Sequence, residues 1–512
     1  MASPKKQIGK QRRALWWVVW IGIVAAGIPT LARWAMRQFG LPAAVFWGTL
    51  PAFLFFVLLL FLVIAWRRRA TTTSAAAESA SVAVLPFTNL SADPDAAFLG
   101  DGLADEIITA LSRVEGLRVA ARSSSFAFRA KADDLRRVGR ELHAGSILEG
   151  SVQRSGDRIR ITTDLVRTAD GERLWSRQYD RELEDVFAIE DEIAESVVRA
   201  LRVILSDRER QAIRRPVPAD VRAYEYYLRG RQFLHETRMK SFDFARTMFE
   251  QAIQVDPSYA LAWAGLAEAG GLLEMFYPGR HEDLAQADEA SLKALDLAPT
   301  LAEAHAARGL VLFLMGQERE ADERFVAAIA RDPRLFQARY YYARACFQRG
   351  WMDEAARQFE EAARIQENYS AAFFSAQSLE ALGRPEEARA RYARSLQVVE
   401  HHMELHPDDP RAATMRSVAL YRTGQPEEGL AWAERALVLD PDDAGVRYNV
   451  ACLFALEGET DRAIDCLEAA IERGFQNRQW FERDPDLASL RDDPRFKALM
   501  QDTGRTQDLR PG

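Results

Sequence analysis

The chain has 512 residues, 48% of them hydrophobic and 28% charged, a composition that suits several folded domains and excludes a largely disordered chain. Its formal net charge of −8 argues against a nucleic-acid binder, because such proteins usually carry a basic stripe. The three cysteines, Cys346, Cys452 and Cys466, are too few and too scattered for a disulfide framework, so we interpret them as packing residues at helical positions.

Two apolar runs open the chain. Residues 14–32 and 41–66 contain no charged side chain, and each is long enough to cross a hydrocarbon core, which needs about 20 apolar residues. Basic residues precede and follow the pair, so the positive-inside rule favours both termini in the cytoplasm. We therefore predict a two-helix transmembrane hairpin in residues 1–69, anchored in an inner membrane. In the alternative, the first run is a signal peptide and the soluble domains lie in the periplasm, although no A-x-A cleavage site follows that run.

A small, polar linker at residues 70–80 leads to a segment, 81–205, that predicts an α/β domain with a mixed sheet. Its β-branched and alternating runs predict strands, and its amphipathic runs predict helices. Gly156-Asp157 and Asp170-Gly171 predict hairpin turns between the last strands. The expected strands are 81–87, 117–121, 146–153, 157–167 and 171–179, and the expected helices are 101–113, 133–142 and 183–205.

Two polar groups in this segment are candidates for a ligand or metal site. Asp101, Asp105 and Glu106 are interpreted as carboxylates of a first helical turn, where the helix dipole favours them, ahead of a metal or acid–base role. The stretch Arg122-Ser123-Ser124-Ser125 is interpreted as a polar loop leaving a strand, ahead of a cradle for an anion.

The stretches 82–87 (VAVLPF) and 102–106 (GLADE) resemble the TolB-like amino-terminal domain. Supporting stretches are 122–126 (RSSSF), 148–152 (LEGSV) and 174–180 (LWSRQYD). The resemblance implies an α/β module that precedes tetratricopeptide repeats and is commonly attached to an adenylate cyclase or winged-helix domain. Neither of these precedes it in this chain, so any output would come from a partner.

Residues 219–475 carry a motif with a period of about 34 residues. A clear copy places small residues at Gly309, Ala321 and Ala328, an aromatic residue at Phe325, and a helix end at Pro333. These offsets resemble the tetratricopeptide repeat, which implies an all-α solenoid of helix pairs. Seven pairs are expected, with an insertion near residues 277–279, an interruption at 401–409, and a helical end cap within 476–512.

The first helix of each pair should line a concave face. Tyrosine and arginine are common interface anchors, because they combine contact area with directed hydrogen bonds. The repeat positions predict the following partner-binding residues on this face: Tyr227, Arg231, Tyr340, Arg344, Phe347, Phe373, Arg411 and Tyr448.

No catalytic residue, cofactor site or metal site is predicted. The sequence lacks a P-loop, a G-x-S-x-G elbow and an H-E-x-x-H helix. His401, His402 and His406 are interpreted as exposed residues of an inter-repeat segment and not as metal ligands. The prediction is a membrane-anchored, non-enzymatic scaffold that binds a protein or peptide, with self-association left open. In the alternative, the α/β domain senses a small molecule or nucleotide and the repeats relay its state.

Overall fold

The computed structural model describes residues 81–92, 97–129, 134–201, 203, 218–235, 238–277, 281–475, 481 and 484–508. All of them belong to one compact unit, which spans Glu78–Gly512. The predicted membrane hairpin lies outside the described residues, and no helix within them is long and apolar enough to cross a bilayer.

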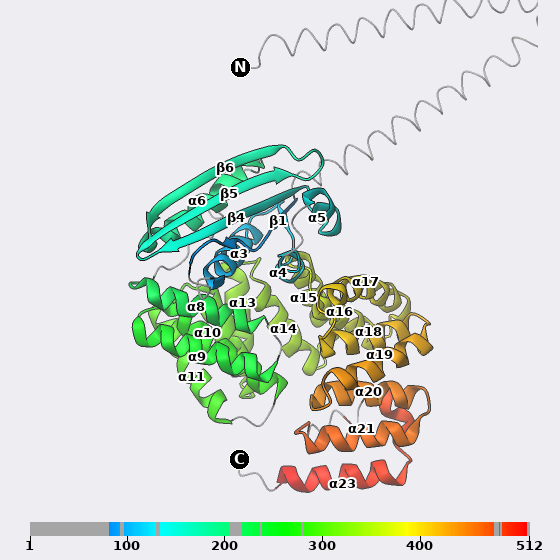
Figure 1. Ribbon diagram of the computed structural model, residues 1–512. Helices are drawn as coiled ribbons and strands as arrows, with labels where there is room; N and C mark the ends of the chain where they lie inside the picture. The colour runs from blue at the N-terminus through cyan, green and yellow to red at the C-terminus, as the bar shows by residue number, and fades with distance from the viewer. Residues whose placement is uncertain are drawn as a thin grey trace, which may run out of the picture. The chain divides into compact units, whose positions relative to one another are not determined.

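The sheet of the α/β domain is mixed, as predicted (Figure 1). Strand β1 (Ser81–Val84) runs parallel to both β3 (Arg118–Val119) and β4 (Ser146–Ser155). The longer strands continue the sheet as an antiparallel meander through β5 (Arg158–Arg167) and β6 (Arg173–Glu182). Gly156 joins β4 to β5 with a φ of +60°, a conformation that glycine adopts without steric cost. A further short strand, β2 (Thr88–Asn89), pairs in parallel with β4.

Helices cover both faces of this sheet. Helix α3 (Ala97–Ser112) and helix α6 (Val186–Ala200) pack on one face, where Leu103, Ile107 and Ile193 meet the inward residues of the strands. Helix α5 (Leu135–Glu141) covers β1 and β4 on the other face through Val138 and nearby residues. The space between the sheet and its helices is filled by apolar side chains, as in ordinary protein cores.

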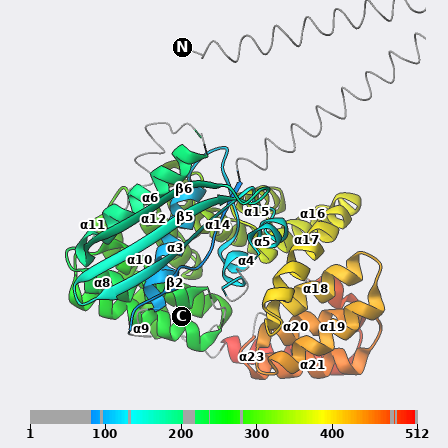
Figure 2. The ribbon, with the colours of Figure 1, turned by 45° about the horizontal axis from the view of Figure 1, so that its top comes forward.

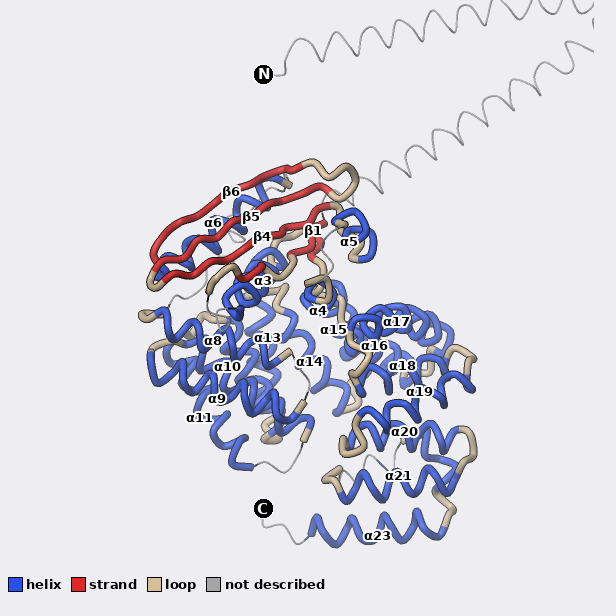
Figure 3. The backbone as a smooth tube through the Cα atoms, viewed as in Figure 1, coloured by secondary structure: helices blue, strands red, loops and turns tan. Residues whose placement is uncertain are grey.

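The rest of the described chain is helical, and it extends from one side of the sheet (Figures 1 and 3). Seven antiparallel pairs follow one another, and Phe249, Phe325 and Phe359 are fully buried within them. Where a glycine faces such a ring, the helices approach closely: a Cβ on Gly309 would lie 2.7 Å from Phe325. The pairs are α8 (Val221–Leu234) with α9 (Met239–Val255), α10 (Ala260–Phe276) with α11 (His281–Leu297), α12 (Ala302–Leu314) with α13 (Glu318–Arg331), α14 (Phe336–Gln348) with α15 (Met352–Ile365), α16 (Tyr369–Ala381) with α17 (Pro385–Leu405), α18 (Pro410–Arg422) with α19 (Pro426–Leu439), and α20 (Ala444–Leu456) with α21 (Thr460–Glu472).

The array ends in a short cap. A 3-10 helix, η3 (Pro485–Leu490), and helix α23 (Pro494–Asp508) bury Leu487, Leu490 and Phe496 against the last pair. The three cysteines are free and buried within the repeats, as expected for packing residues.

The α/β domain and the first repeats share one apolar core. Leu228 of α8 packs against Gly102 of α3, where a Cβ would lie 2.5 Å from the leucine Cδ1. Arg113, just after α3, pairs with Asp332 at 2.9 Å and also with Glu303. Figure 2 shows the long strands in front of α8, α10 and α12. The α/β domain is therefore joined to the repeats through buried contacts.

Two helices are longer than their counterparts in the other repeats. Helix α10 has 17 residues, whereas α12, α14, α16, α18 and α20 each have 13. Helix α17 has 21 residues, whereas α13, α15 and α19 each have 14. These extra turns stand at the predicted insertion near residue 277 and at the predicted interruption at 401–409.

Candidate functional site: the inner groove of the repeats

A large cavity runs along the inner side of the array, and we call it the inner groove. Its volume is about 1830 Å³. The four helices α14, α16, α18 and α20 each contribute several side chains to its lining, and the cap contributes Asp484 and Asp486. The α/β domain also reaches it, because Asp101 of α3 and residues of α4 (Arg122–Phe126) belong to its lining.

Seven of the eight predicted partner-binding residues line this groove, and Tyr227 does not. The Tyr227 ring is buried beside Tyr224, Phe249 and Tyr259, with centroid distances of 5.3–6.2 Å. The reason is tertiary: α3 packs along α8, so this part of the first repeat joins the shared core. The seven that line the groove are Arg231, Tyr340, Arg344, Phe347, Phe373, Arg411 and Tyr448.

Several of these seven have structural partners within the protein. Arg231 pairs with Glu268 at 3.2 Å, and Arg411 pairs with the buried Asp443 at 2.8 Å. Tyr448 donates a hydrogen bond to Asp484 of the cap and stacks on Phe475. Their hydrogen-bonding groups therefore already hold the array together.

Helix α14 presents a different surface. The Tyr340 ring stacks on Phe336 with a centroid distance of 5.4 Å, and the Arg344 guanidinium lies over the Phe374 ring at 4.5 Å. Within the described part of the chain, neither the Tyr340 hydroxyl nor the Arg344 guanidinium has a hydrogen bond or an ion pair. The other groove arginines each have a carboxylate partner: Arg122 with Asp105, Arg129 with Asp101, Arg231 with Glu268, Arg238 with Asp408, Arg349 with Asp322, Arg411 with Asp443, and Arg422 with Asp486.

A buried polar cluster lies where the α/β domain meets α8. Asp105 contacts Arg122 at 3.3 Å and His235 at 3.2 Å. Burial alone would raise the pKa of Asp105, but His235 and Arg122 hold that pKa well below its usual range. Burial and the neighbouring Arg122 lower the pKa of His235 to about 4, so this imidazole is neutral at pH 7. Asp105 is therefore the charged partner of Arg122 in the folded protein.

The cluster corrects two interpretations from the sequence. The helix begins at Ala97, so Asp101 and Asp105 lie beyond its first turn and are buried in ion pairs. Residues 122–126 form the helix α4 and not a polar loop, and Ser124 and Ser125 are buried in it. No local sequence pattern indicates this cluster, because its members lie up to 130 positions apart.

The two lengthened helices bring contacts across the groove. Phe276, in the last turn of α10, lies under the Arg411 guanidinium at 4.1 Å. The last turns of α17 pack near α4 of the α/β domain, and His402 contacts Asp409 at 2.9 Å. The expectation of exposed histidines was therefore wrong for His402, because its side chain is 15% exposed and paired.

Comparison with known proteins supports this architecture. Residues 78–196 match the family described as "HilA/YgeH-like transcriptional regulator, second domain", and residues 306–372 and 375–444 match the tetratricopeptide repeat. The protein is thus a tetratricopeptide-repeat protein with a regulator-like α/β domain. That class of repeat indicates a role in protein interactions.

A curated relative, "Putative adenylate cyclase 3" of Rhizobium meliloti (strain 1021), is 37% identical over 244 residues. The match covers 47% of this chain, and this chain spans only 42% of that relative.

Solved structures with a similar fold include YrrB, described as a TPR protein with an unusual peptide-binding site. It is 22% identical and covers 36% of this chain and 92% of its own, with a TM-score of 0.26. A tetratricopeptide repeat protein from Parabacteroides merdae is 15% identical and covers 53% of this chain and 99% of its own, with a TM-score of 0.33. The human IFIT1 dimer with PPP-AAAA is 14% identical, and the match covers 80% of this chain and 92% of the IFIT1 chain, with a TM-score of 0.43.

Proposed function

We propose that this protein is a membrane-anchored, non-enzymatic scaffold that binds an extended segment of a partner protein in the inner groove. The observation that carries the proposal is the surface of α14, where the Tyr340 hydroxyl and the Arg344 guanidinium have no hydrogen-bond or ion-pair partner among the described residues. A cation and a hydroxyl that border a cavity are available to a ligand, whereas the largely buried paired arginines, such as Arg231 and Arg411, would first have to leave their carboxylates.

The size of the groove favours a polypeptide over a small molecule. Its volume of about 1830 Å³ exceeds the range of roughly 300–1,000 Å³ that is usual for small-ligand sites. Aromatic rings from several repeats, including Phe347 and Phe373, line it alongside α14. An extended segment could use these rings for apolar contact and Arg344 for a carboxylate.

The test compares partner capture by the full chain and by a Tyr340→Ala/Arg344→Ala variant. Loss of two anchors should cost on the order of 2–4 kcal/mol, which weakens binding by about 30-fold or more. Arg319→Ala is the matched control, because Arg319 is highly exposed on α13 and does not line the groove. Equal capture of every partner by the double variant and the control would contradict the proposal.

A second candidate function is sensing by the α/β domain, which resembles the TolB-like domain, with relay through the repeats. Polar contacts at the junction favour it. His235, which follows α8, pairs with Asp105, and Arg231 of α8 pairs with Glu268, which accepts a hydrogen bond from Tyr341 of α14. Against it, the core between the sheet and its helices is filled. A smaller cavity of about 200 Å³ beside Glu149 and Asp164 is below the usual range for ligand sites. A nucleotide that raises the melting temperature, an effect lost in Glu149→Gln, would favour sensing.

The proposed function includes a membrane anchor formed by the N-terminal residues. Two uncharged apolar runs within residues 1–69, with basic residues on their outer sides, support an inner-membrane hairpin with cytoplasmic soluble domains. Such an anchor would confine the groove to partners that meet the membrane surface.

A further inference from the structure

We infer that the α/β domain supplies part of the partner-binding site: Phe126 and Arg129, at the end of α4, receive an acidic stretch of the bound segment. The inference rests on the proposed function, because it takes the inner groove as the place of binding. It extends the site beyond the repeats to a second domain of the same chain.

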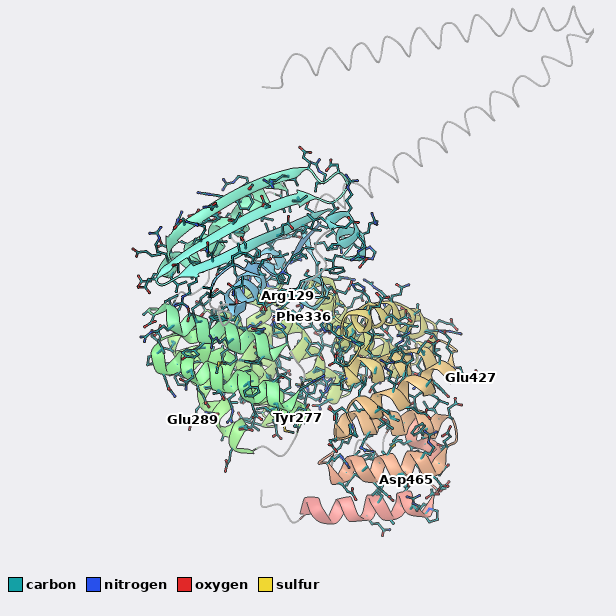
Figure 4. All side chains as sticks on the ribbon, in the orientation of Figure 1. Arg129, Tyr277, Glu289, Phe336, Glu427 and Asp465 are labelled. Carbon is teal, nitrogen blue, oxygen red and sulfur yellow. The ribbon has the colours of Figure 1, made fainter. Side chains whose placement is uncertain are left out.

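The end of α4 forms a wall of the groove. Ser123, Ser124, Phe126 and Arg129 belong to the same lining as Phe336 and Tyr340 of α14. Figure 4 labels Arg129, which comes from the α/β domain, and Phe336, which comes from the repeats. A segment that lies on α14 toward its first turn would therefore approach both domains.

The chemistry of this wall favours a carboxylate. Two guanidinium groups lie near the Phe126 ring, Arg122 at 4.0 Å and Arg129 at 5.9 Å from its centroid. Arg129 pairs with Asp101, whose side chain is only 4% exposed, yet the Arg129 side chain is 51% exposed. A guanidinium carries five N–H donors, so Arg129 keeps donors for a second acceptor on its exposed side.

Arg344 and Arg129 therefore offer two cationic positions, with aromatic surface at Phe126 and Phe336 beside them. The complementary occupant is a protein segment in which acidic residues accompany an aromatic or apolar residue. A single-stranded nucleic acid would also offer negative charge and stacking bases. It fits less well, because Asp443, Asp484 and Asp486 also line the groove and would repel the phosphate of every nucleotide, whereas a peptide can interrupt its acidic residues with uncharged ones.

The experiment uses the full chain in detergent micelles and three fluorescent probes. One is a dodecapeptide with the repeat Glu-Glu-Phe-Gly, one replaces each Glu by Lys, and one is a twelve-nucleotide oligoadenylate. Binding is measured by fluorescence anisotropy at fixed salt concentration. The acidic peptide should bind more tightly than the other two.

Two groove variants and one control then locate the bound peptide. Arg344→Gln should weaken the acidic peptide by about tenfold, the loss of one charge-assisted hydrogen bond. Arg129→Gln, combined with Asp101→Asn so that no buried carboxylate loses its partner, should weaken it by a similar factor. Arg319→Gln should change it less than about twofold, as expected of an exposed charge outside the groove.

The possible binding results distinguish the groove proposal from the proposed role of the α/β domain. If Arg344→Gln weakens binding and the Arg129/Asp101 double variant does not, the groove proposal stands and the role of the α/β domain is wrong. If neither variant matters, or if no peptide binds, both proposals are wrong. Tighter binding of the oligoadenylate would overturn the acidic occupant. Melting temperatures check folding. Should the double variant melt early, Phe126→Leu replaces it, because that change leaves the Arg129–Asp101 and Arg122–Asp105 pairs in place and should still weaken binding.

Discussion

The contact between Gly102 and Leu228 tests whether the α/β domain is seated on the repeats. A Cβ at residue 102 would lie 2.5 Å from Leu228 Cδ1 and 2.9 Å from Leu228 Cβ and Cδ2, closer than atoms of two side chains approach. Gly102→Ala should therefore overpack the junction at a cost of roughly 1–3 kcal/mol. Alanine also favours a helix interior over glycine by about 1 kcal/mol, so the net loss should be up to about 2 kcal/mol.

The Leu228→Ala background should reverse the sign of this effect. Leu228 is buried, and its truncation alone should cost about 2–5 kcal/mol. Once the leucine is shortened, the new Cβ at 102 has room, and the helix preference of alanine remains. Gly102→Ala should then stabilise the protein by up to about 1 kcal/mol, which is a coupling of roughly 2 kcal/mol between the two sites.

The assay is urea unfolding of the four proteins of this double-mutant cycle, followed by circular dichroism. Gly309 and Phe325 supply a matched cycle inside one repeat, because a Cβ on Gly309 would lie 2.7 Å from the ring. In that cycle, Phe325→Leu removes the ring that the new Cβ of Gly309→Ala would meet. Additive effects at residues 102 and 228, together with coupling at 309 and 325, would show that α3 does not pack on α8 as described.

Three other predictions concern the groove rim, pH and topology. Phe276→Leu leaves the Arg411–Asp443 pair intact but removes the aromatic ring under Arg411. Amide hydrogen exchange in the last turn of α10 should therefore speed up several-fold, and unchanged exchange would contradict the contact between Phe276 and Arg411. The unfolded chain binds a proton at His235 near pH 6.5, whereas the folded chain binds it only near pH 4. The free energy of unfolding should therefore fall by on the order of 1 kcal/mol from pH 7 to pH 4.5, and it should fall less in His235→Gln. An equally steep fall in that variant would refute this assignment. Reporters fused after Gly512 should be active in the cytoplasm, whereas periplasmic activity would contradict the hairpin.

Local patterns were sufficient to predict most of the fold. The strands β4 and β5 follow alternating runs and a two-residue turn at Gly156, and both features act between neighbours in sequence. The seven helix pairs follow from small residues and phenylalanines at fixed offsets, because each repeat packs mainly against the next. These are the cases in which a residue's environment is set within about one repeat length.

The errors concern residues whose environment is set from far away in the chain. Helix α4 is five residues long, too short to show a helical period, and Arg122 in it is held by the buried Asp105. Tyr227 occupies a repeat position like that of Tyr340, and both residues are largely buried, but only Tyr340 lines the groove. No pattern within one repeat contains this information, so the candidate site could be predicted on α14 but not at the domain junction.

The departures from the repeat period explain how the groove acquires its walls. A regular helix pair places its defining residues, such as Phe325 and Ala328, inside the repeat, where they cannot meet a distant one. Helix α10 exceeds the common length by four residues, which adds about 6 Å, or one turn, and that turn carries Phe276 to Arg411. Helix α17, with 21 residues, is at least four residues, or about 6 Å, longer than any other second helix of a pair, and its end reaches the neighbourhood of α4. The residues that break the pattern are therefore those that make contacts across the groove, and they bring the α/β domain to the place where a partner would bind.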